Sequence, residues 1–168
     1  LNYEDFLTPD SLLSYDITTG DIESLKSLPG KFDASGLKAE QFFATSKDGT
    51  KVPYFIVHKG DMPLDGSTPT LLYGYGGFRG GGEFGPAWHQ AGLKRDRQRI
   101  FDDFIAVGED LITRKVTRPE RLGIMGGSNG GLLMGVMLNQ RPDLWNAAVV
   151  QVPLLDMLRY HVLLAGAS

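Results

Sequence analysis

The feature of the sequence that most constrains the fold is a glycine-rich stretch around Ser128. Gly126 lies two residues before this serine and Gly130 two residues after it, which gives the G-x-S-x-G pattern of a nucleophile elbow. In such an elbow the serine occupies a sharp, strained turn between a strand and a helix, where neighbours with a Cβ atom would strike adjacent backbone. The sequence therefore predicts that Gly126, Gly127, Gly130 and Gly131 make room for an exposed serine hydroxyl.

The residues that flank the glycines indicate a strand followed by a helix. Residues 122–125 have the apolar character of a short buried strand, and residues 130–139 have helical spacing. The segment 141–143, Arg-Pro-Asp, is expected to end this helix because proline cannot continue it. In this arrangement the Ser128 hydroxyl is a nucleophile, and the backbone N–H of Asn129 lies at the helix N-terminus, where it can stabilise an oxyanion. The alternative is a glycine-rich turn in which the serine has no chemical role.

Strands and helices alternate over most of the chain after residue 40. Residues 70–73 predict a short buried strand, residues 100–112 an amphipathic helix, and residues 147–152 a further strand. Together with the strand and helix around Ser128, this order predicts an α/β fold with a mostly parallel sheet. The acidic side chains between residues 102 and 110 are expected to form the solvated face of the amphipathic helix. Its apolar face is expected to comprise Ile100, Phe101, Phe104, Ile105, Leu111 and Ile112.

The first forty residues have a different pattern. Residues 11–28 predict a hairpin of two short strands, and residues 29–38 predict a linker. A hairpin of this size is marginal in water by itself, so it should belong to a larger β structure. A second hairpin is expected from residues 41–58, with Asp-Gly at its turn. We therefore expect two domains, residues 1–38 and residues 39–168.

Charge and composition exclude several classes of partner. The net charge is −3, with 17 basic and 20 acidic residues, so no positive field is expected to gather nucleic acid or an anionic membrane surface. The absence of cysteine excludes disulfides, thiolate catalysis and zinc–thiolate sites. No apolar run approaches the roughly 20 residues of a membrane span, and the first residues lack the features of a secretory signal. We expect a soluble, cytoplasmic protein that acts on small uncharged or peptide-like ligands.

The histidines add little further chemistry. Asp156 and His161 follow Ser128 in the order that a serine hydrolase requires, but they are only five residues apart. An acid and a base normally come from separate loops, so that the imidazole can lie between carboxylate and hydroxyl. Asp156 is therefore predicted to cap a helix, and His58 and His89 are predicted to be structural or exposed. No two histidines have metal-ligand spacing, so no metal and no cofactor are expected.

Residues 80–85 raise one alternative of a different class. They satisfy G-x-G-x-x-G, the pattern of a dinucleotide-binding loop. Such a loop follows a strand directly, opens a helix and precedes a second strand that ends in an acidic residue, whereas Asp102 and Asp103 lie within the predicted amphipathic helix. Dinucleotide binding is therefore the weaker alternative, and a shift of the melting temperature by excess NAD would support it.

Five segments occur in a characteristic order: residues 73–78, 79–85, 88–89, 126–131 and 139–144. Together they resemble the prolyl oligopeptidase family of serine peptidases, and the resemblance covers nearly the whole chain. It implies that residues 1–28, which include the predicted hairpin, match the last strands of that family's β-propeller. The part from about residue 40 onward resembles its α/β-hydrolase domain, which has a mostly parallel sheet.

The resemblance assigns roles to four residues. Ser128 falls on the family's nucleophile, Asn129 on its backbone oxyanion donor, and Tyr75 on the tyrosine whose hydroxyl is the second oxyanion donor. Phe78 falls on a phenylalanine that lines the substrate pocket. The position of Tyr75 also suits its donor role without the resemblance, because a phenolic hydroxyl at the carboxyl end of a strand can point into the crevice where α/β proteins bind ligands. The alternative is that Tyr75 is an aromatic residue of the core.

The activity implied by the resemblance is that of a serine endopeptidase, which cleaves short peptides after proline through an acyl-enzyme on Ser128. Esterase or acylaminoacyl-peptidase activity are alternatives that would use the same elbow.

The sequence departs from the family pattern in three places. Phe78 runs directly into Arg79, where family members insert a helix and a strand, so the sheet is expected to be incomplete. No residue matches the catalytic aspartate or histidine, and the chain reaches Ser168 where the family continues. The remaining propeller and the C-terminal hydrolase segments are therefore expected partners of this chain. Alone, the 168 residues are expected to be inactive; the alternative is a silent fragment or paralogue that acts at most as a binding module.

Overall fold

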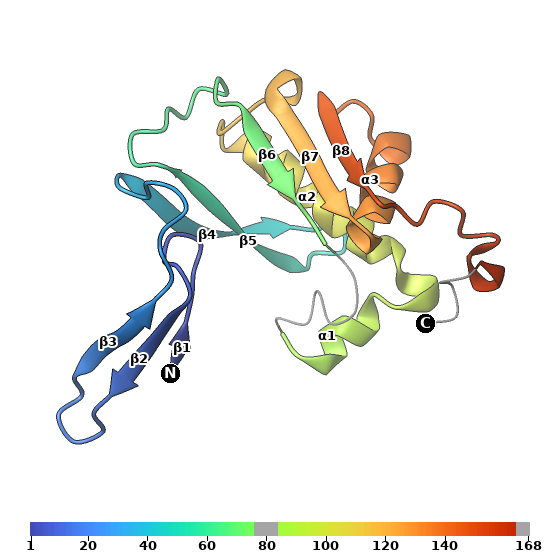
Figure 1. Cartoon of the computed structure of the whole chain (residues 1–168). Helices are drawn as coiled ribbons and strands as arrows, with labels where there is room; N and C mark the ends of the chain where they lie inside the picture. Colours follow the sequence, from blue (N-terminus) through green and yellow to red (C-terminus); the bar gives the residue numbers. More distant parts are fainter. Residues whose placement is uncertain (76–83, 164–168) are drawn as a thin grey trace. The chain divides into compact units, whose positions relative to one another are not determined.

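The computed structural model describes residues 1–75 and 84–163. The chain forms two compact units, coloured along the sequence in Figure 1. The first unit comprises Leu1–Phe42 and Pro53–Met62, and the second comprises Phe43–Val52 and Pro63–Ser168. A hairpin therefore contributes residues to both units, and the expected domain boundary after residue 38 stays a prediction.

The first unit contains a three-stranded antiparallel sheet in the order β1-β2-β3. Strands β2 (Ser11–Tyr15) and β3 (Ile22–Ser27) form the predicted hairpin, and the two-residue strand β1 (Asn2–Tyr3), which was not predicted, pairs with β2. The turn is built by Asp16, whose carboxylate accepts the backbone N–H groups of the next two threonines at 2.7 and 3.2 Å. Gly20 completes it with a φ of 81°, which side chains with a Cβ rarely adopt.

The second hairpin consists of β4 (Leu37–Thr45) and β5 (Lys51–Lys59), which pair with each other. Both strands are longer than predicted, and β4 begins inside the expected linker. The turn has the predicted chemistry, because Gly49 has a φ of 88° and the Asp48 carboxylate accepts the backbone N–H of Thr50 at 2.9 Å. Asp48 is therefore a turn residue.

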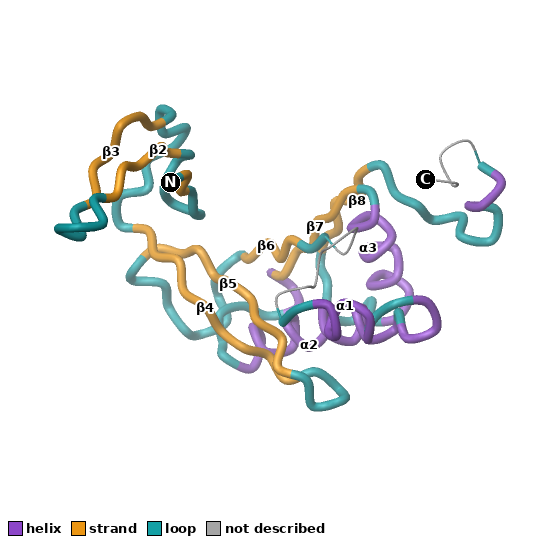
Figure 2. Tube along the Cα trace, turned by 90° about the horizontal axis from the view of Figure 1, so that it is seen from below, coloured by secondary structure: helices purple, strands orange, loops and turns teal. Residues whose placement is uncertain are grey.

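The second unit confirms the predicted parallel sheet. Strands β6 (Thr70–Tyr73), β7 (Leu122–Gly127) and β8 (Ala147–Gln151) are parallel and adjacent in that order. Helices α2 (Gln98–Thr113) and α3 (Asn129–Gln140) connect them along the chain. Both helices lie on the same face of the sheet, as Figure 2 shows.

The opposite face of this sheet is apolar and exposed in the described part of the chain. On the covered face, Leu122 and Ile124 are completely buried. On the other face, Leu71, Tyr73 and Val149 are 59%, 63% and 45% exposed. The strand register places Tyr73 and Val149 on either side of the same β7 residue. Because parallel sheets are normally covered on both faces, this surface fits the expectation of an incomplete sheet.

Helix α2 confirms the predicted helix but shifts its buried face. Of the six predicted apolar positions, Phe104 and Leu111 are buried, and the other four are half-buried. The difference arises from Trp145, which packs against Phe104 with ring centroids 5.9 Å apart. A Cβ atom on Gly108 would lie 2.5 Å from the same indole ring. The glycine therefore lets a large side chain approach the helix backbone, which the apolar spacing could not reveal.

The expectation that the acidic side chains of α2 form a solvated face holds for Glu109, which is exposed, but is wrong for Asp103. Asp103 is half-buried, and burial raises the pKa of its carboxyl, although a hydrogen bond from Ser46 lowers it. Glu109 and Asp110 each form an ion pair with an arginine. Glu109 thereby joins α2 to Arg141 at the end of α3, whereas Asp110 pairs with Arg114 at the end of α2 itself.

Within residues 1–75 and 84–163, four short helices were not predicted from the sequence. They are α1 (Pro86–Ala91) and the 3₁₀ turns Lys94–Asp96, Pro119–Arg121 and Tyr160–Val162. Each has at most six residues, which is too short for a helical period to appear.

Candidate active site

Ser128 occupies the strained turn that the glycine pattern predicts. It stands between the end of β7 and the first residue of α3, with φ 55° and ψ −115°. A positive φ is uncommon for a residue with a Cβ atom, and such strain of about 1–3 kcal/mol persists only where the surroundings hold it. The Ser128 backbone N–H is held by the Gln151 carbonyl of β8 at 3.0 Å. The elbow geometry is therefore confirmed.

The Ser128 hydroxyl is not used to build the helix. A serine at this position normally accepts a hydrogen bond from a backbone N–H of the first helical turn. In this structure the Ser128 side chain forms no capping hydrogen bond to α3. The residue is half-buried at the carboxyl edge of the parallel sheet, where α/β proteins bind ligands. Its oxygen is therefore available for chemistry.

Three of the four glycines around the serine are required by close backbone contacts. A Cβ atom on Gly126 would lie 2.5 Å from the Gly130 carbonyl oxygen and 2.8 Å from that of Gly74. A Cβ atom on Gly130 would strike the Gly74 carbonyl as well. On Gly131 it would lie 2.8 Å from the Gln151 carbonyl oxygen. These contacts press the elbow between the ends of β6 and β8.

The fourth glycine corrects the sequence-based expectation. A Cβ atom on Gly127 would meet nothing closer than the Gln151 Cβ at 3.6 Å, which is an ordinary contact. The side chain at this position would point to the open face of the sheet, away from the packed turn. Gly127 therefore makes no room for the serine.

Substitutions at the two neighbouring glycines should separate these roles. We expect Gly126→Ala to destabilise the fold by about 1–3 kcal/mol, because overpacking against backbone cannot be relieved by a rotamer change. Gly127→Ala should stay within roughly 0.5 kcal/mol of the wild type. Thermal denaturation of the two variants side by side measures the difference, and equal melting temperatures would contradict the contact geometry.

Asn129, the predicted oxyanion donor, is the first residue of α3. The first N–H groups of a helix have no intrahelical acceptor, so the Asn129 N–H is available to a ligand. Its side chain is fixed from another element, because the Arg97 Nη2 donates to the Asn129 Oδ1 at 2.5 Å. Arg97 was not identified from the sequence. The sequence feature that could have pointed to Arg97 is its positive charge directly before the N-terminus of α2, where the helix dipole disfavours a cation.

Tyr75, the predicted second donor, lies next to the elbow. It follows β6 by two residues, and its Cα would be 3.4 Å from a Cβ atom on Gly130. The residue is 40% exposed, so it does not belong to the core of the described chain. Its position makes the proposed role geometrically reasonable, and the role itself stays a prediction.

Phe78 and most of the G-x-G-x-x-G segment lie outside the described residues. The predicted pocket role of Phe78 and the dinucleotide alternative therefore stay predictions. At the end of this segment, Gly85 precedes α1 with a φ of 89°.

Asp156 and His161 are not joined in the described structure. The Asp156 carboxylate accepts the backbone N–H of Arg159 at 3.2 Å and its Nε at 2.6 Å. This arrangement resembles the predicted cap, although it precedes only a turn and a 3₁₀ helix. His161 lies exposed in that 3₁₀ helix. The internal acid–base pair thus gains no support from the contacts.

His58 has a structural role. Its Nε2 lies 2.6 Å from the Glu40 Oε2, and its Nδ1 lies 2.6 Å from the Lys59 carbonyl oxygen. Its side chain is only 12% exposed. The ring therefore links the two strands of the second hairpin. His89 lies half-buried in α1.

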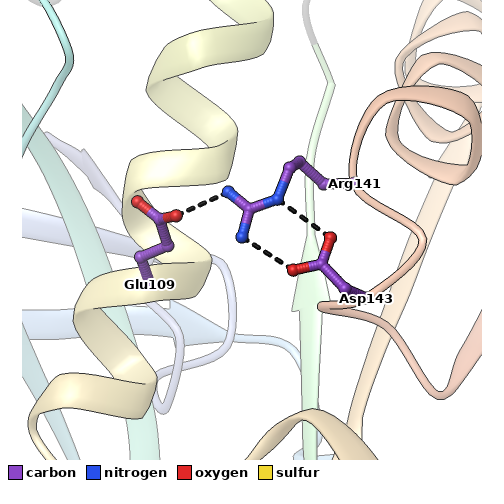
Figure 3. Close-up of polar contacts among 3 residues, drawn as sticks. All are labelled: Glu109, Arg141 and Asp143. Atoms are coloured by element: carbon purple, nitrogen blue, oxygen red, sulfur yellow. Dashed lines mark hydrogen bonds and ion pairs between the residues drawn. The ribbon is translucent and has the colours of Figure 1, made fainter.

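An ion-pair cluster fixes the end of α3 against α2, as Figure 3 shows. The Arg141 guanidinium donates to both carboxylate oxygens of Asp143, each at 2.9 Å, and to Glu109 at 2.5 Å. The hydrogen bonds from Arg141 lower the pKa of Asp143, and those to Asp143 and Glu109 raise the pKa of Arg141. As predicted, α3 ends directly before this arginine.

Residues 1–75 and 84–163 contain no group of three or more histidine, aspartate or glutamate side chains that could hold a metal ion. No helix in the same part of the chain is long and apolar enough to cross a membrane.

Comparison with known proteins identifies the family. The model of the Prolyl oligopeptidase family matches residues 73–164, which is more than half of the chain and includes the elbow. The chain belongs to this family. The resemblance inferred from the five sequence segments is therefore confirmed.

Relatives in this family match almost the whole chain. An uncharacterized peptidase, y4nA of Sinorhizobium fredii, is 55% identical over 98% of this chain and 27% of its own length. A prolyl endopeptidase of Elizabethkingia meningoseptica is 39% identical over 99% of this chain and 28% of its own. The solved structure of a post-proline cleaving enzyme from Rickettsia typhi has a TM-score of 0.87 at 39% identity, covering 98% of this chain and 28% of that chain.

These matches cover almost all of this chain but only part of each relative. The chain spans just over a quarter of the relatives' length. The first alignment runs over 193 residues, more than the 168 of this chain, so the relative carries residues that have no counterpart here.

Proposed function

We propose that these residues are the nucleophile-bearing part of a serine peptidase of the prolyl oligopeptidase family. The observation that carries the proposal is the Ser128 turn, with a positive φ and a hydroxyl that caps no helix. A strained serine of this kind at the carboxyl edge of a parallel sheet is typical of a nucleophile elbow.

The proposed reaction starts with attack of the Ser128 Oγ on the carbonyl carbon of the scissile peptide. A histidine elsewhere in the full-length protein takes the proton of the Ser128 hydroxyl and later delivers it to the leaving amine. The tetrahedral oxyanion accepts hydrogen bonds from the Asn129 N–H and the Tyr75 hydroxyl. Collapse breaks the C–N bond and leaves an acyl-enzyme on Ser128, which water then hydrolyses. Phe78 is proposed to line the pocket for the residue before the cut.

Proline before the scissile bond is the proposed specificity, and short peptides are the proposed substrates. The support comes from relatives that are named prolyl endopeptidase or post-proline cleaving enzyme. Esterase or acylaminoacyl-peptidase activity would use the same elbow. The proline specificity is tested in the full-length protein with chromogenic peptides that differ only in whether proline or alanine precedes the scissile bond. A preference for alanine, or for an ester alone, would refute the proline assignment.

The N-terminal residues 1–38 are proposed to be the last strands of a propeller-like domain, and residues 39–168 the first part of a hydrolase domain. The proposal is supported by the exposed apolar side chains of the first sheet, including Leu12, Ile22 and Leu25, which require further β structure to cover them.

Tyr75→Phe tests the second oxyanion donor. The change removes one hydroxyl and keeps the ring, so folding should be unaffected. We expect kcat to fall by about 10²–10³-fold in the full-length protein, as for loss of one oxyanion donor elsewhere. KM should change little, because the hydrogen bond is strongest in the transition state. An unchanged kcat in steady-state assays would show that Tyr75 only packs.

A further inference from the structure

We propose that Arg97 is a positioning residue for the reaction, which holds the oxyanion donor Asn129 in place and adds positive charge at the oxyanion site. The inference rests on the proposed function of Ser128. It begins from a contact between residues 32 positions apart in the sequence: the Arg97 Nη2 donates to the Asn129 Oδ1 at 2.5 Å.

Asn129 is the one side chain through which the elbow can be held. Between residues 126 and 131 every residue except Ser128 and Asn129 is glycine. The serine side chain must stay free to react. An asparagine has only two side-chain torsions, so fixing its Oδ1 restricts its Cα and its backbone N–H. The Arg97 guanidinium therefore restrains the donor group that the oxyanion needs.

The chain beside Arg97 makes a second contact with α3. Arg97 directly precedes α2, and the next residue, Gln98, forms a reciprocal amide pair with Gln140 at the end of α3, with distances of 2.9 and 3.0 Å. The start of α2 is thus attached to α3 through Arg97 and Gln98.

The charge of Arg97 has no structural explanation in the described residues. Its Nε is buried without a hydrogen-bond partner in the described part of the chain, and none of the ion pairs found there includes Arg97. The first turns of α2 and α3 contain no acidic residue. A cation beside two helix N-termini opposes both helix dipoles, so it does not serve helix stability. It does favour a negative charge that develops on a substrate oxygen beside the Asn129 N–H.

The test uses the full-length protein and four variants assayed with a chromogenic peptide. Arg97→Gln removes the charge and the guanidinium fork. Asn129→Ala removes the acceptor but keeps the backbone N–H. The double variant removes both partners. Arg95→Gln is the matched control, because Arg95 is an exposed arginine two residues away.

We expect Arg97→Gln and Asn129→Ala each to lower kcat by about 10-fold to 10²-fold, the effect of a small misplacement of a reacting group. KM and the melting temperature should stay close to wild type, and Arg95→Gln should behave as wild type. The double variant should be no worse than the poorer single variant, because both changes break the same contact.

Several outcomes would overturn the inference. They are a kcat within twofold of wild type for Arg97→Gln, losses that multiply in the double variant, or a loss confined to KM and the melting temperature. If Arg97→Gln fails to fold, Asn129→Ala decides alone, since it breaks the contact from the other side. Ser128→Ala in the same series separates the two proposals: turnover in that variant refutes the nucleophile, whereas an inactive Ser128→Ala beside a normal Arg97→Gln refutes only the role of Arg97.

Discussion

Ser128→Ala in the full-length protein is expected to abolish peptide hydrolysis and leave the fold intact. Loss of the nucleophilic serine costs on the order of 10⁶-fold in kcat in a serine protease, because no other group can form the acyl-enzyme. The fold should survive, since the Ser128 hydroxyl caps no helix and its removal leaves no capping hydrogen bond unmade. Initial rates with a proline-containing chromogenic peptide measure the effect. Normal turnover would remove Ser128 from the mechanism.

Ser128→Gly provides a matched control for the strain at this position. Alanine has the same Cβ atom as serine, so Ser128→Ala keeps the unfavourable backbone at φ 55°. Glycine adopts this region without the steric cost, which is about 1–3 kcal/mol for residues with a Cβ. Both variants should be inactive, but the glycine variant should melt at the higher temperature. A glycine variant that melts below the alanine variant would show that the turn is not strained.

The parts of the site that the sequence predicted are those set by local stereochemistry. Few backbone conformations are open to a serine that has glycines two residues before and after it and lies between an apolar run and a helical pattern. The positive φ of Ser128 is one of these conformations. The role of Gly127 was predicted wrongly because a clash depends on what lies beside the residue in space. A Cβ atom on Gly126 would strike the Gly74 carbonyl, more than fifty residues away in sequence, whereas one on Gly127 would make only ordinary contacts with Gln151.

Contacts between distant segments explain the other differences. Arg97 and Asn129 meet through the packing of α2 against α3, and no motif contains both residues. Asp103 was expected in solvent, but the tip of the β4–β5 hairpin covers it through Ser46. Strand β1 has two residues, too few for an alternating pattern to indicate it. In each case the local sequence indicates only a preference for one conformation or exposure. The contact that determines the observed structure comes from a segment elsewhere in the fold.

The isolated 168-residue chain is expected to be close to inactive, despite its complete elbow. A serine hydroxyl is a weak nucleophile until a base removes its proton, and that base must be a histidine oriented by a carboxylate. The candidates within the chain do not meet this need, because the Asp156 carboxylate is occupied by Arg159 and His161 lies exposed. We expect no turnover of a proline-containing substrate above background and at most slow labelling of Ser128 by a fluorophosphonate.

The measurement compares initial rates of the purified chain with those of its Ser128→Ala and His161→Ala variants. Because Leu71, Tyr73 and Val149 expose an apolar sheet face, the rates should be taken on material that elutes as a monomer in size-exclusion chromatography. Without its base, a serine protease retains only roughly 10³–10⁴-fold acceleration over water from binding and the oxyanion hole. Robust activity that both variants lose would show that His161 serves as the base. Robust activity that only Ser128→Ala loses would place the base at another group within these 168 residues.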